Sequence, residues 1–310
     1  DDRTHSALLV IPCYNEEENI AGILNHLASI QETLVNRKNL RFDVLIINDG
    51  STDGTRDILE NSCHEAGCSV IHLEKNRGYG YVLRTGFKQA ESDNFEWVIS
   101  FDMDGQHEPK CLFKFIDKIM IDEYQDFGII SGSRYKDPSL FWQNPWKDRF
   151  LVNTVITGIL NSIGFNLSDS FCGMKAHKVK EINELGLKLD GYEMPIEMLM
   201  KAKSQGLKIF ELAVPVIYKN RDEVLKTKST DTFLFKKGGE RIQRYISLIN
   251  QFNDGRDLNP MIPQFQAVFE KQFAKIDEIT GENFRQIQSA IYTEINQIIN
   301  GDKTNNDGTT

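Results

Sequence analysis

Two aspartates separated by one residue, Asp102 and Asp104, are well suited to hold a metal ion. They follow an apolar run over residues 95–101 that predicts a buried strand. Carboxylates are hard oxygen ligands, and Mg²⁺ or Mn²⁺ is commonly bound by one or two of them together with the phosphate oxygens of a substrate. An isolated pair of this kind is usually a solvated turn, but this pair follows the fourth strand in a regular series. The sequence therefore predicts a Mg²⁺ or Mn²⁺ site here.

The first hundred residues alternate between apolar strands and amphipathic helices. Strands are predicted at residues 7–11, 42–47, 70–73 and 97–101, with helices between them. This alternation predicts an α/β fold with a mostly parallel sheet flanked by helices. Ligands of such sheets bind beyond the carboxyl ends of the strands. The polar clusters of this chain follow those ends, at residues 14–16, 48–50, 76–78 and 102–104.

The rest of the chain is less regular. Further strands are predicted at 128–131 and 170–176, and another within 207–218, where Pro215 breaks it. Helices are predicted at 146–163 and 193–205. From residue 233 the pattern is helical, with amphipathic spacing over 262–299 and a break at Gly281. We therefore expect an α/β domain over residues 1–232, a helical extension over 233–300 and a disordered tail over 301–310.

Composition limits the classes of partner. The 310 residues are 40% hydrophobic, which is ample for a large core, and the net charge of −9 argues against a nucleic-acid partner. No apolar run reaches the ~18 residues that a membrane-spanning helix needs, and no signal peptide is visible. The five scattered cysteines are typical of a reducing compartment, and their spacing matches no common zinc pattern. These features lead us to expect a cytoplasmic protein.

The polar residues after the first two strands are suited to a nucleotide. Tyr14 offers a stacking surface, Glu16 can accept a hydroxyl hydrogen bond, and Asp49 can accept from a base or ribose. The segment 76–80 has a Gly-x-Gly but lacks the third glycine of a dinucleotide fingerprint, and no Gly-Lys-Ser/Thr occurs. These absences disfavour a Rossmann dehydrogenase and a P-loop enzyme.

Taken together, the four clusters resemble family 2 glycosyltransferases with the GT-A fold. The nearest branch is the one that transfers sugars to dolichyl or polyprenyl phosphate. The resemblance covers about residues 7–221, and it is carried by segments 10–16, 48–55, 76–78 and 102–107. One such motif would be weak evidence, but four in order at consecutive strand ends are specific.

The resemblance implies a UDP- or GDP-sugar donor and a place for each part of it. The nucleotide pocket would be lined by Pro12, Tyr14, Glu16 and Asp49. The metal that bridges the diphosphate would be held by Asp102, Asp104 and Gln106.

The resemblance also implies an acceptor side. Arg134 lies in a Gly-Ser-Arg-Tyr segment that matches the branch, whose arginine contacts phosphate. Arg149, with Asn153 four residues later, resembles a second acceptor-phosphate site, although the branch more often has serine at the second position. Asp169 opens a segment similar to the Asp-x-x-x-Gly-Phe-Arg stretch near the acceptor, and residues 193–197 fall in the branch's acidic helix.

The residue chemistry leaves two acceptors open. A lipid phosphate is already a nucleophile and needs only positioning by Arg134 and Arg149. A hydroxyl acceptor requires a carboxylate base, for which Asp169 is the first candidate. In both cases a metal ion and nearby arginines would stabilise the diphosphate that leaves.

We therefore predict a metal-dependent hexosyltransferase acting on polyprenyl or dolichyl phosphate, cytoplasmic or peripheral at the cytoplasmic face of a membrane. The inverting outcome comes from the family resemblance. The aromatic and basic segment 233–237 is a candidate membrane contact, and an ordinary packed helix is an equal alternative. The alternative function is a soluble transferase acting on a glycan, protein or small-molecule hydroxyl. A nucleotidyltransferase and an inactive sugar-nucleotide binding module are less favoured.

Overall fold

The structure is a computed structural model, and it describes residues 4–34, 36–102, 107–141, 144–217, 238–253 and 255–301. The chain forms two compact units, each assembled from separate stretches of sequence. Unit 1 comprises Asp1–Gly132 and Cys172–Val214, and unit 2 comprises Ser133–Phe171 and Pro215–Thr310. The predicted domain boundary between residues 232 and 233 and the tail after residue 301 lie outside the described residues.

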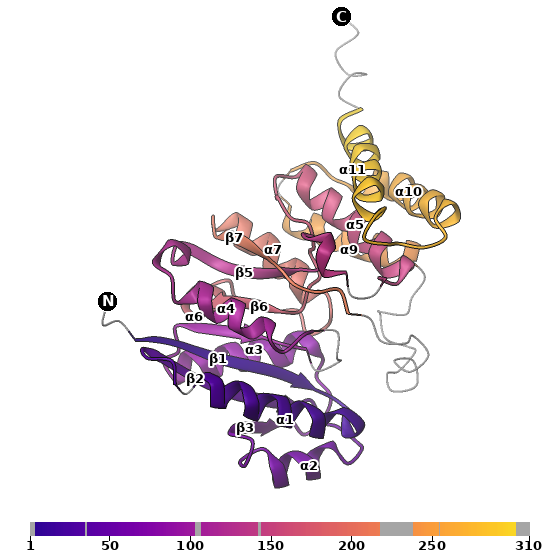
Figure 1. The fold of residues 1–310 in the computed structure, drawn as a ribbon. Helices are drawn as coiled ribbons and strands as arrows, with labels where there is room; N and C mark the ends of the chain where they lie inside the picture. The colour runs from indigo at the N-terminus through magenta and orange to yellow at the C-terminus, as the bar shows by residue number, and fades with distance from the viewer. Residues whose placement is uncertain are drawn as a thin grey trace, which may run out of the picture. The chain divides into compact units, whose positions relative to one another are not determined.

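Unit 1 is built on a seven-stranded sheet (Figure 1). The strands are β1 (His5–Cys13), β2 (Leu40–Asn48), β3 (Cys68–His72), β4 (Trp97–Ser100), β5 (Phe127–Ser133), β6 (Lys175–Lys178) and β7 (Lys208–Ala213). They lie in the order β3-β2-β1-β4-β6-β5-β7. β1 is parallel to β2 and β4, and β2 is parallel to β3, whereas β6 is antiparallel to β4 and β5. The mostly parallel sheet predicted from the sequence is confirmed.

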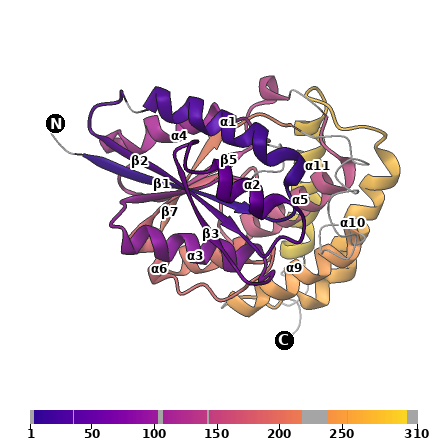
Figure 2. The same cartoon turned by 90° about the horizontal axis from the view of Figure 1, so that it is seen from below.

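Helices cover both faces of this sheet. One face packs against α1 (Glu17–Leu34), α2 (Thr55–Ser62) and α4 (Cys111–Ile119). The other face packs against α3 (Tyr79–Ser92), α6 (Val179–Glu184) and α7 (Met194–Ser204). Figure 2 shows α1 and α4 on one side of the strands and α3 and α6 on the opposite side.

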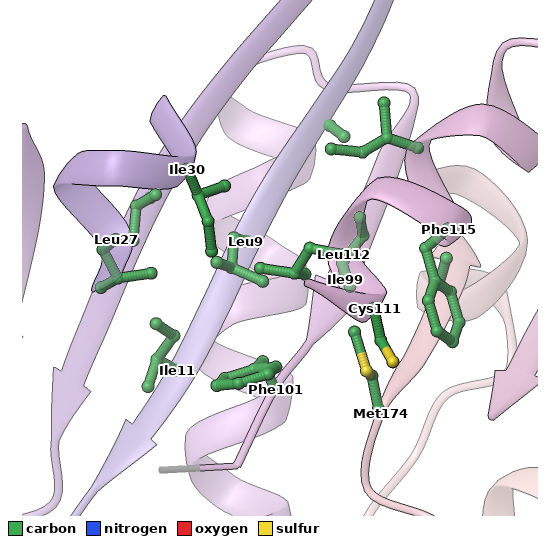
Figure 3. Packing of buried hydrophobic residues seen from close by; sticks show 14 of the residues in the cluster. Leu9, Ile11, Leu27, Ile30, Ile99, Phe101, Cys111, Leu112, Phe115 and Met174 are labelled. Atoms are coloured by element: carbon green, nitrogen blue, oxygen red, sulfur yellow. The ribbon is translucent and has the colours of Figure 1, made fainter. Parts of the chain in front are cut away.

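The alternation of side chains along each strand supplies two separate cores. Leu9 and Ile11 of β1 enter the first, where Figure 3 shows them near Leu27 and Phe101, and where α4 contributes Leu112 and Phe115. The intervening residues of β1 point to the α3 side, because successive side chains on a strand face opposite ways. Both faces of the central strand are therefore buried, which explains its unbroken apolar sequence.

The structure differs from the sequence predictions at one strand and at one short helix. The strand expected over residues 170–176 is shorter and later, because only β6 (Lys175–Lys178) pairs with its neighbours. The helix α6 was not predicted, because its six residues are too few for a recognisable helical period.

Unit 2 is helical. Its main helices are α5 (Lys147–Ser162), α9 (Gly238–Phe252), α10 (Ile262–Lys275) and α11 (Phe284–Gly301), which gather around α5 (Figure 1). Every residue of α5 from 150 to 160 is buried. A helix buried all round needs neighbours on every side, and α9, α10 and α11 supply them. The predicted amphipathic helices with a break near Gly281 are confirmed.

Two further features bear on the sequence expectations. Cys63 and Cys68 form a disulfide across the turn between α2 and β3, and the other three cysteines are free and buried. This pair was not foreseen, because the turn that brings the two Cα atoms to 5.1 Å is not evident in the sequence. No helix in the described segments combines the length and hydropathy that crossing a bilayer requires.

Candidate functional site

The carboxyl ends of β1, β2 and β3 lie side by side. The sheet register pairs Cys13 with Asn48, and Asn48 with His72. The loops that follow these strands therefore leave the sheet at one edge, where ligands of parallel sheets bind. Two sequence-predicted clusters, residues 14–16 and 48–50, meet at this edge.

The loops after β1 and β2 hold each other through hydrogen bonds. The N–H of Asn15 donates to Ser51 Oγ at 2.9 Å, and the N–H of Thr52 donates to Asn15 Oδ1 at 2.9 Å. The N–H of Glu16 donates to Thr55 Oγ1 at 2.9 Å. Asn15 has a φ of 52°, in the left-handed region that asparagine tolerates better than most residues. The polar residues of this edge are thus fixed by side-chain to backbone contacts.

This interlocking presents the predicted nucleotide residues together. Pro12 lies in β1 beside Ile47 of β2. Tyr14 is 42% exposed, so much of its ring is accessible for stacking. Glu16 is largely buried, and its carboxylate accepts from Asn19 Nδ2 at 2.8 Å. Their contact with a nucleotide stays a prediction.

Asp49 is buried at the end of β2 and is held by the segment that precedes α3. Its Oδ1 accepts the N–H of Arg77 at 2.7 Å and its Oδ2 accepts the N–H of Gly78 at 2.9 Å. Burial raises the pKa of Asp49 above its ordinary value, and the two backbone hydrogen bonds offset only part of that rise. Each carboxylate oxygen retains a lone pair, so Asp49 can still accept a hydrogen bond from a base.

Asp102 follows β4 and lies directly against Gly173. A Cβ on Gly173 would overlap Asp102 Oδ2, so the carboxylate occupies space that any other residue at 173 would fill. The Ser100 hydroxyl donates to the carbonyl of Gly173 at 2.7 Å and holds this backbone in place. Asp102 is therefore positioned by a glycine far away in the sequence.

The Asp102 carboxylate has the properties expected of a cation ligand. Its Oδ1 is buried and accepts no hydrogen bond from the described part of the chain, while His107 Nε2 lies 3.6 Å from its Oδ2. A buried oxygen without a donor is unusual unless something else satisfies it, and a divalent cation would do so. Asp104 and Gln106 lie outside the described residues. Within those residues no group of three or more His, Cys, Asp or Glu side chains could hold a metal ion.

Arg134 and Asp169, both in unit 2, form a buried bidentate ion pair. Arg134 Nε donates to Asp169 Oδ2 at 2.7 Å, and Nη2 donates to Oδ1 at 3.0 Å. The backbone N–H groups of Arg134 and Phe171, with Asn153 Nδ2, donate to the same carboxylate at 2.7–3.1 Å. Sequence reasoning named the arginine and the aspartate separately, and the structure brings them together.

This environment makes Asp169 a strong acid. Burial acts to raise the pKa of its carboxyl, but the Arg134 charge and the hydrogen bonds outweigh burial and lower the pKa to about 2. A carboxylate of such low basicity, with hydrogen bonds to both oxygens, is poorly suited to remove a proton from a hydroxyl group.

The predicted pairing of Arg149 with Asn153 takes a different form. Asn153 is buried and bonds Asp169, and its Oδ1 also accepts from Thr157 Oγ1 at 2.9 Å. Arg149 is half-buried, and its guanidinium lies 4.6 Å from the ring centroid of Trp146. The role of either residue in binding a phosphate stays a prediction.

Comparisons with known proteins give one family model and several similar proteins. A family model described as Glycosyl transferase family 2 matches residues 8–183. The UDP-N-acetylglucosamine–dolichyl-phosphate N-acetylglucosaminyltransferase of Methanococcus voltae is 30% identical over 228 residues, which cover 68% of this chain and 85% of that protein. The polyprenol monophosphomannose synthase of Mycolicibacterium smegmatis is 25% identical, covering 71% of this chain and 79% of its own length.

A solved structure shares the fold. The crystal structure of mannosyl-3-phosphoglycerate synthase from Rubrobacter xylanophilus superposes with a TM-score of 0.52 at 13% identity, covering 81% of this chain and 77% of that chain. At this level of identity the likeness concerns the fold alone.

Proposed function

The chain belongs to glycosyl transferase family 2, and from that premise we propose that it transfers a sugar from a UDP- or GDP-sugar to polyprenyl or dolichyl phosphate. Two of its relatives are named for a dolichyl-phosphate acceptor and for a polyprenol product. The polar residues at the carboxyl ends of β1 and β2 support a nucleotide at this edge of the sheet.

The choice of acceptor rests on one observation: the Asp169 carboxylate has a low pKa, and both of its oxygens accept hydrogen bonds. A hydroxyl acceptor must lose a proton as it attacks, and an efficient general base has a pKa near the working pH. The pKa of Asp169 is lowered to about 2, and its oxygens are occupied by Arg134, Asn153 and Phe171. A phosphate acceptor is already an anion at neutral pH and needs no base. The low basicity of the Asp169 carboxylate therefore favours a lipid phosphate over a hydroxyl group as the acceptor.

In the proposed reaction, an oxygen of the acceptor phosphate attacks the anomeric carbon of the sugar. The bond from that carbon to the donor's diphosphate breaks, and the nucleoside diphosphate leaves with the electron pair. A single displacement inverts the configuration at the anomeric carbon. A Mg²⁺ or Mn²⁺ ion held by Asp102, with Asp104 and Gln106, would neutralise the charge of the diphosphate when bound.

The arginines of unit 2 supply the positive charge for the acceptor. Arg134 lies directly after the end of β5, and we assign its guanidinium, which suits bidentate contact with a phosphate, to the acceptor. Arg149 is half-buried, and we assign it to the same phosphate. Because a polyprenyl phosphate resides in a bilayer, we propose that the enzyme works at a membrane surface; the segment 233–237 suggested for that contact lies outside the described residues.

The first test uses Arg149→Ala in a transfer assay. Wild-type enzyme is incubated with UDP-N-acetylglucosamine, UDP-glucose or GDP-mannose, polyprenyl phosphate in detergent and Mn²⁺, and the glycolipid is measured by mass spectrometry. We expect the variant to lose at least about tenfold in transfer, the cost of one hydrogen bond to a charged group. Binding of the nucleoside diphosphate should be unchanged.

Arg56→Ala, which removes an exposed arginine on α2 that pairs with Glu60, is the matched control and should behave as wild type. Lack of polyprenyl phosphate turnover by the wild type, with every nucleotide sugar that it binds, would contradict the lipid acceptor. The hydroxyl acceptor would then become the leading alternative.

A further inference from the structure

Glu197 is a buried carboxylate on α7 that the proposed chemistry does not use. Its side chain is 1% exposed. Its oxygens accept the N–H of Lys188 at 2.9 and 3.1 Å, the N–H of Leu189 at 2.8 Å and Lys201 Nζ at 2.7 Å. A buried carboxylate is costly unless it is hydrogen-bonded, and here two consecutive backbone N–H groups supply three of these four bonds. Glu197 thus fixes the backbone of residues 188–189.

The segment held by this carboxylate in turn holds the beginning of α3. The carbonyl of Leu189 accepts from Arg84 Nη1 at 2.7 Å, and the Asp190 carboxylate pairs with Arg84 Nη2. The carbonyl of Asp190 accepts the N–H of Gly80 at 2.7 Å and the N–H of Tyr81 at 3.2 Å. A Cβ on Gly80 would collide with the Leu189 carbonyl, so the two backbones are in close contact.

The residues immediately before α3 complete the connection to Asp49. The N–H groups of Arg77 and Gly78 donate to the two oxygens of that carboxylate. Gly78 has a φ of 95°, and a Cβ there would lie 2.6 Å from the carbonyl oxygen of Asp190. The same carbonyl therefore limits the position of Gly78 and of the N–H that it donates. Contacts run without interruption from Glu197 to Asp49, entirely within unit 1.

We propose that Glu197 is a positioning residue for the nucleotide pocket, which orients Asp49 toward the base through residues 188–190 and the beginning of α3. The inference rests on the proposed function, in which Asp49 accepts a hydrogen bond from the base. A carboxylate suits this role because both of its oxygens accept hydrogen bonds, whereas glutamine has only one acceptor oxygen.

The test is isothermal titration calorimetry of the Glu197→Gln variant with UDP and with GDP, each in the presence of Mn²⁺. We expect the Kd of the nucleotide that the wild type binds to rise about tenfold, the lower end of what losing one hydrogen bond to a charged group causes. The Kd of inorganic pyrophosphate with Mn²⁺ should not change, because pyrophosphate has no base. Ile116→Ala on α4, which opens a cavity on the opposite face of the sheet, should lower the Tm but leave both Kd values unchanged.

A double-mutant cycle distinguishes positioning from general loss of stability. In an Asp49→Ala background, Glu197→Gln should cause no further weakening of nucleotide binding, because the residue it acts through is absent. Additive effects of the two substitutions, or an unchanged Kd in Glu197→Gln, would overturn the proposal. If Asp49→Ala alone leaves nucleotide binding intact, the nucleotide assignment within the proposed function fails instead.

Arg84→Met provides a second variant should Glu197→Gln not fold. This substitution removes the guanidinium that bonds the Leu189 carbonyl and the Asp190 carboxylate. It keeps the buried carboxylate of Glu197 and its hydrogen-bond partners. We expect Arg84→Met also to raise the Kd of the nucleotide and to leave the Kd of pyrophosphate unchanged. Equal Kd values for Arg84→Met and wild type with the nucleotide would count against the proposal.

Discussion

Gly173 limits where the Asp102 carboxylate can lie. Because a side chain at position 173 would overlap Asp102 Oδ2, the absence of a Cβ is a requirement of this arrangement. The glycine does not have a positive φ, so its role is to leave space and not to allow an unusual backbone. A substitution at Gly173 should therefore displace the Asp102 side chain while leaving its carboxylate chemically unchanged.

We predict that Gly173→Ala displaces the carboxylate and weakens the contribution of Mn²⁺ to nucleotide binding. Calorimetric titration of UDP and GDP with and without Mn²⁺ measures this, and the metal-dependent gain in affinity should fall at least about tenfold, as for losing one interaction with a charged group. Gly22→Ala on α1, where a Cβ would meet nothing within 4 Å, is the matched control. A full metal effect in Gly173→Ala would contradict the role assigned to Asp102.

The Arg134–Asp169 pair shows why some substitutions are poor tests of catalysis. Both side chains are buried, at 10% and 0% exposure. Removing one partner leaves an uncompensated buried charge, which typically destabilises a protein by about 3–5 kcal/mol. Loss of activity in either variant would therefore not separate folding from chemistry, and Arg149 is the more informative position.

Among the strands, β6 is distinguished by a histidine in the middle of the sheet. His177 pairs with Val98 of β4 and Ile129 of β5, and its ring centroid lies 5.2 Å from that of Phe87 on α3. Burial, together with the nearby charge of Lys175, lowers the pKa of His177 to about 3. The histidine is therefore neutral in the folded protein at physiological pH.

This histidine should make stability fall as the pH falls. Below pH 6.5 the unfolded chain binds a proton at position 177 that the folded protein does not bind until about pH 3. The free energy of unfolding should lose about 1.4 kcal/mol for each pH unit in that window. Urea unfolding of wild type and His177→Gln between pH 7 and pH 4 measures the effect, and the gap between the two proteins should change by about this slope. Parallel curves would show that the histidine does not carry the pH dependence.

Over the whole chain, each unit is assembled from two separate stretches of sequence. Residues 133–171 precede the second part of unit 1, yet α5 within them packs with α9, α10 and α11 near the end of the chain. The burial of the apolar residues of α5 therefore depends on helices that lie about a hundred residues later in the sequence.

We predict that a chain ending at residue 232 does not fold as a well-packed protein. Without α9–α11, the apolar sides of α5 that they cover become exposed, so the truncated chain should bind the dye ANS and be cleaved rapidly by protease within residues 147–162. The control ends at residue 301 and should match the full chain in Tm. Cooperative unfolding of the shorter chain at an unchanged Tm would show that α5 needs no partners from the C-terminal helices.

Local patterns in the sequence were sufficient for most of the elements and for the polar edge of the sheet at which we propose the nucleotide. The apolar runs around Leu9, Leu45 and Ile99 predicted parallel strands, because side-chain period depends on neighbouring residues. The polar residues after these strands predicted a nucleotide edge, which stays a prediction. The motifs at these strand ends also led to the family, which the family model confirms.

Long-range packing was needed for the rest. The insertion of antiparallel β6 between β4 and β5, the space at Gly173 for Asp102, and the ion pair of Arg134 with Asp169 all join residues far apart in the chain. No local pattern specifies such pairs, since they depend on which surfaces meet after the elements form. The same reason explains how Asp169, plausible as a base from its sequence neighbours, becomes a strongly acidic partner of an arginine: its pKa is set by the groups that the fold places around it.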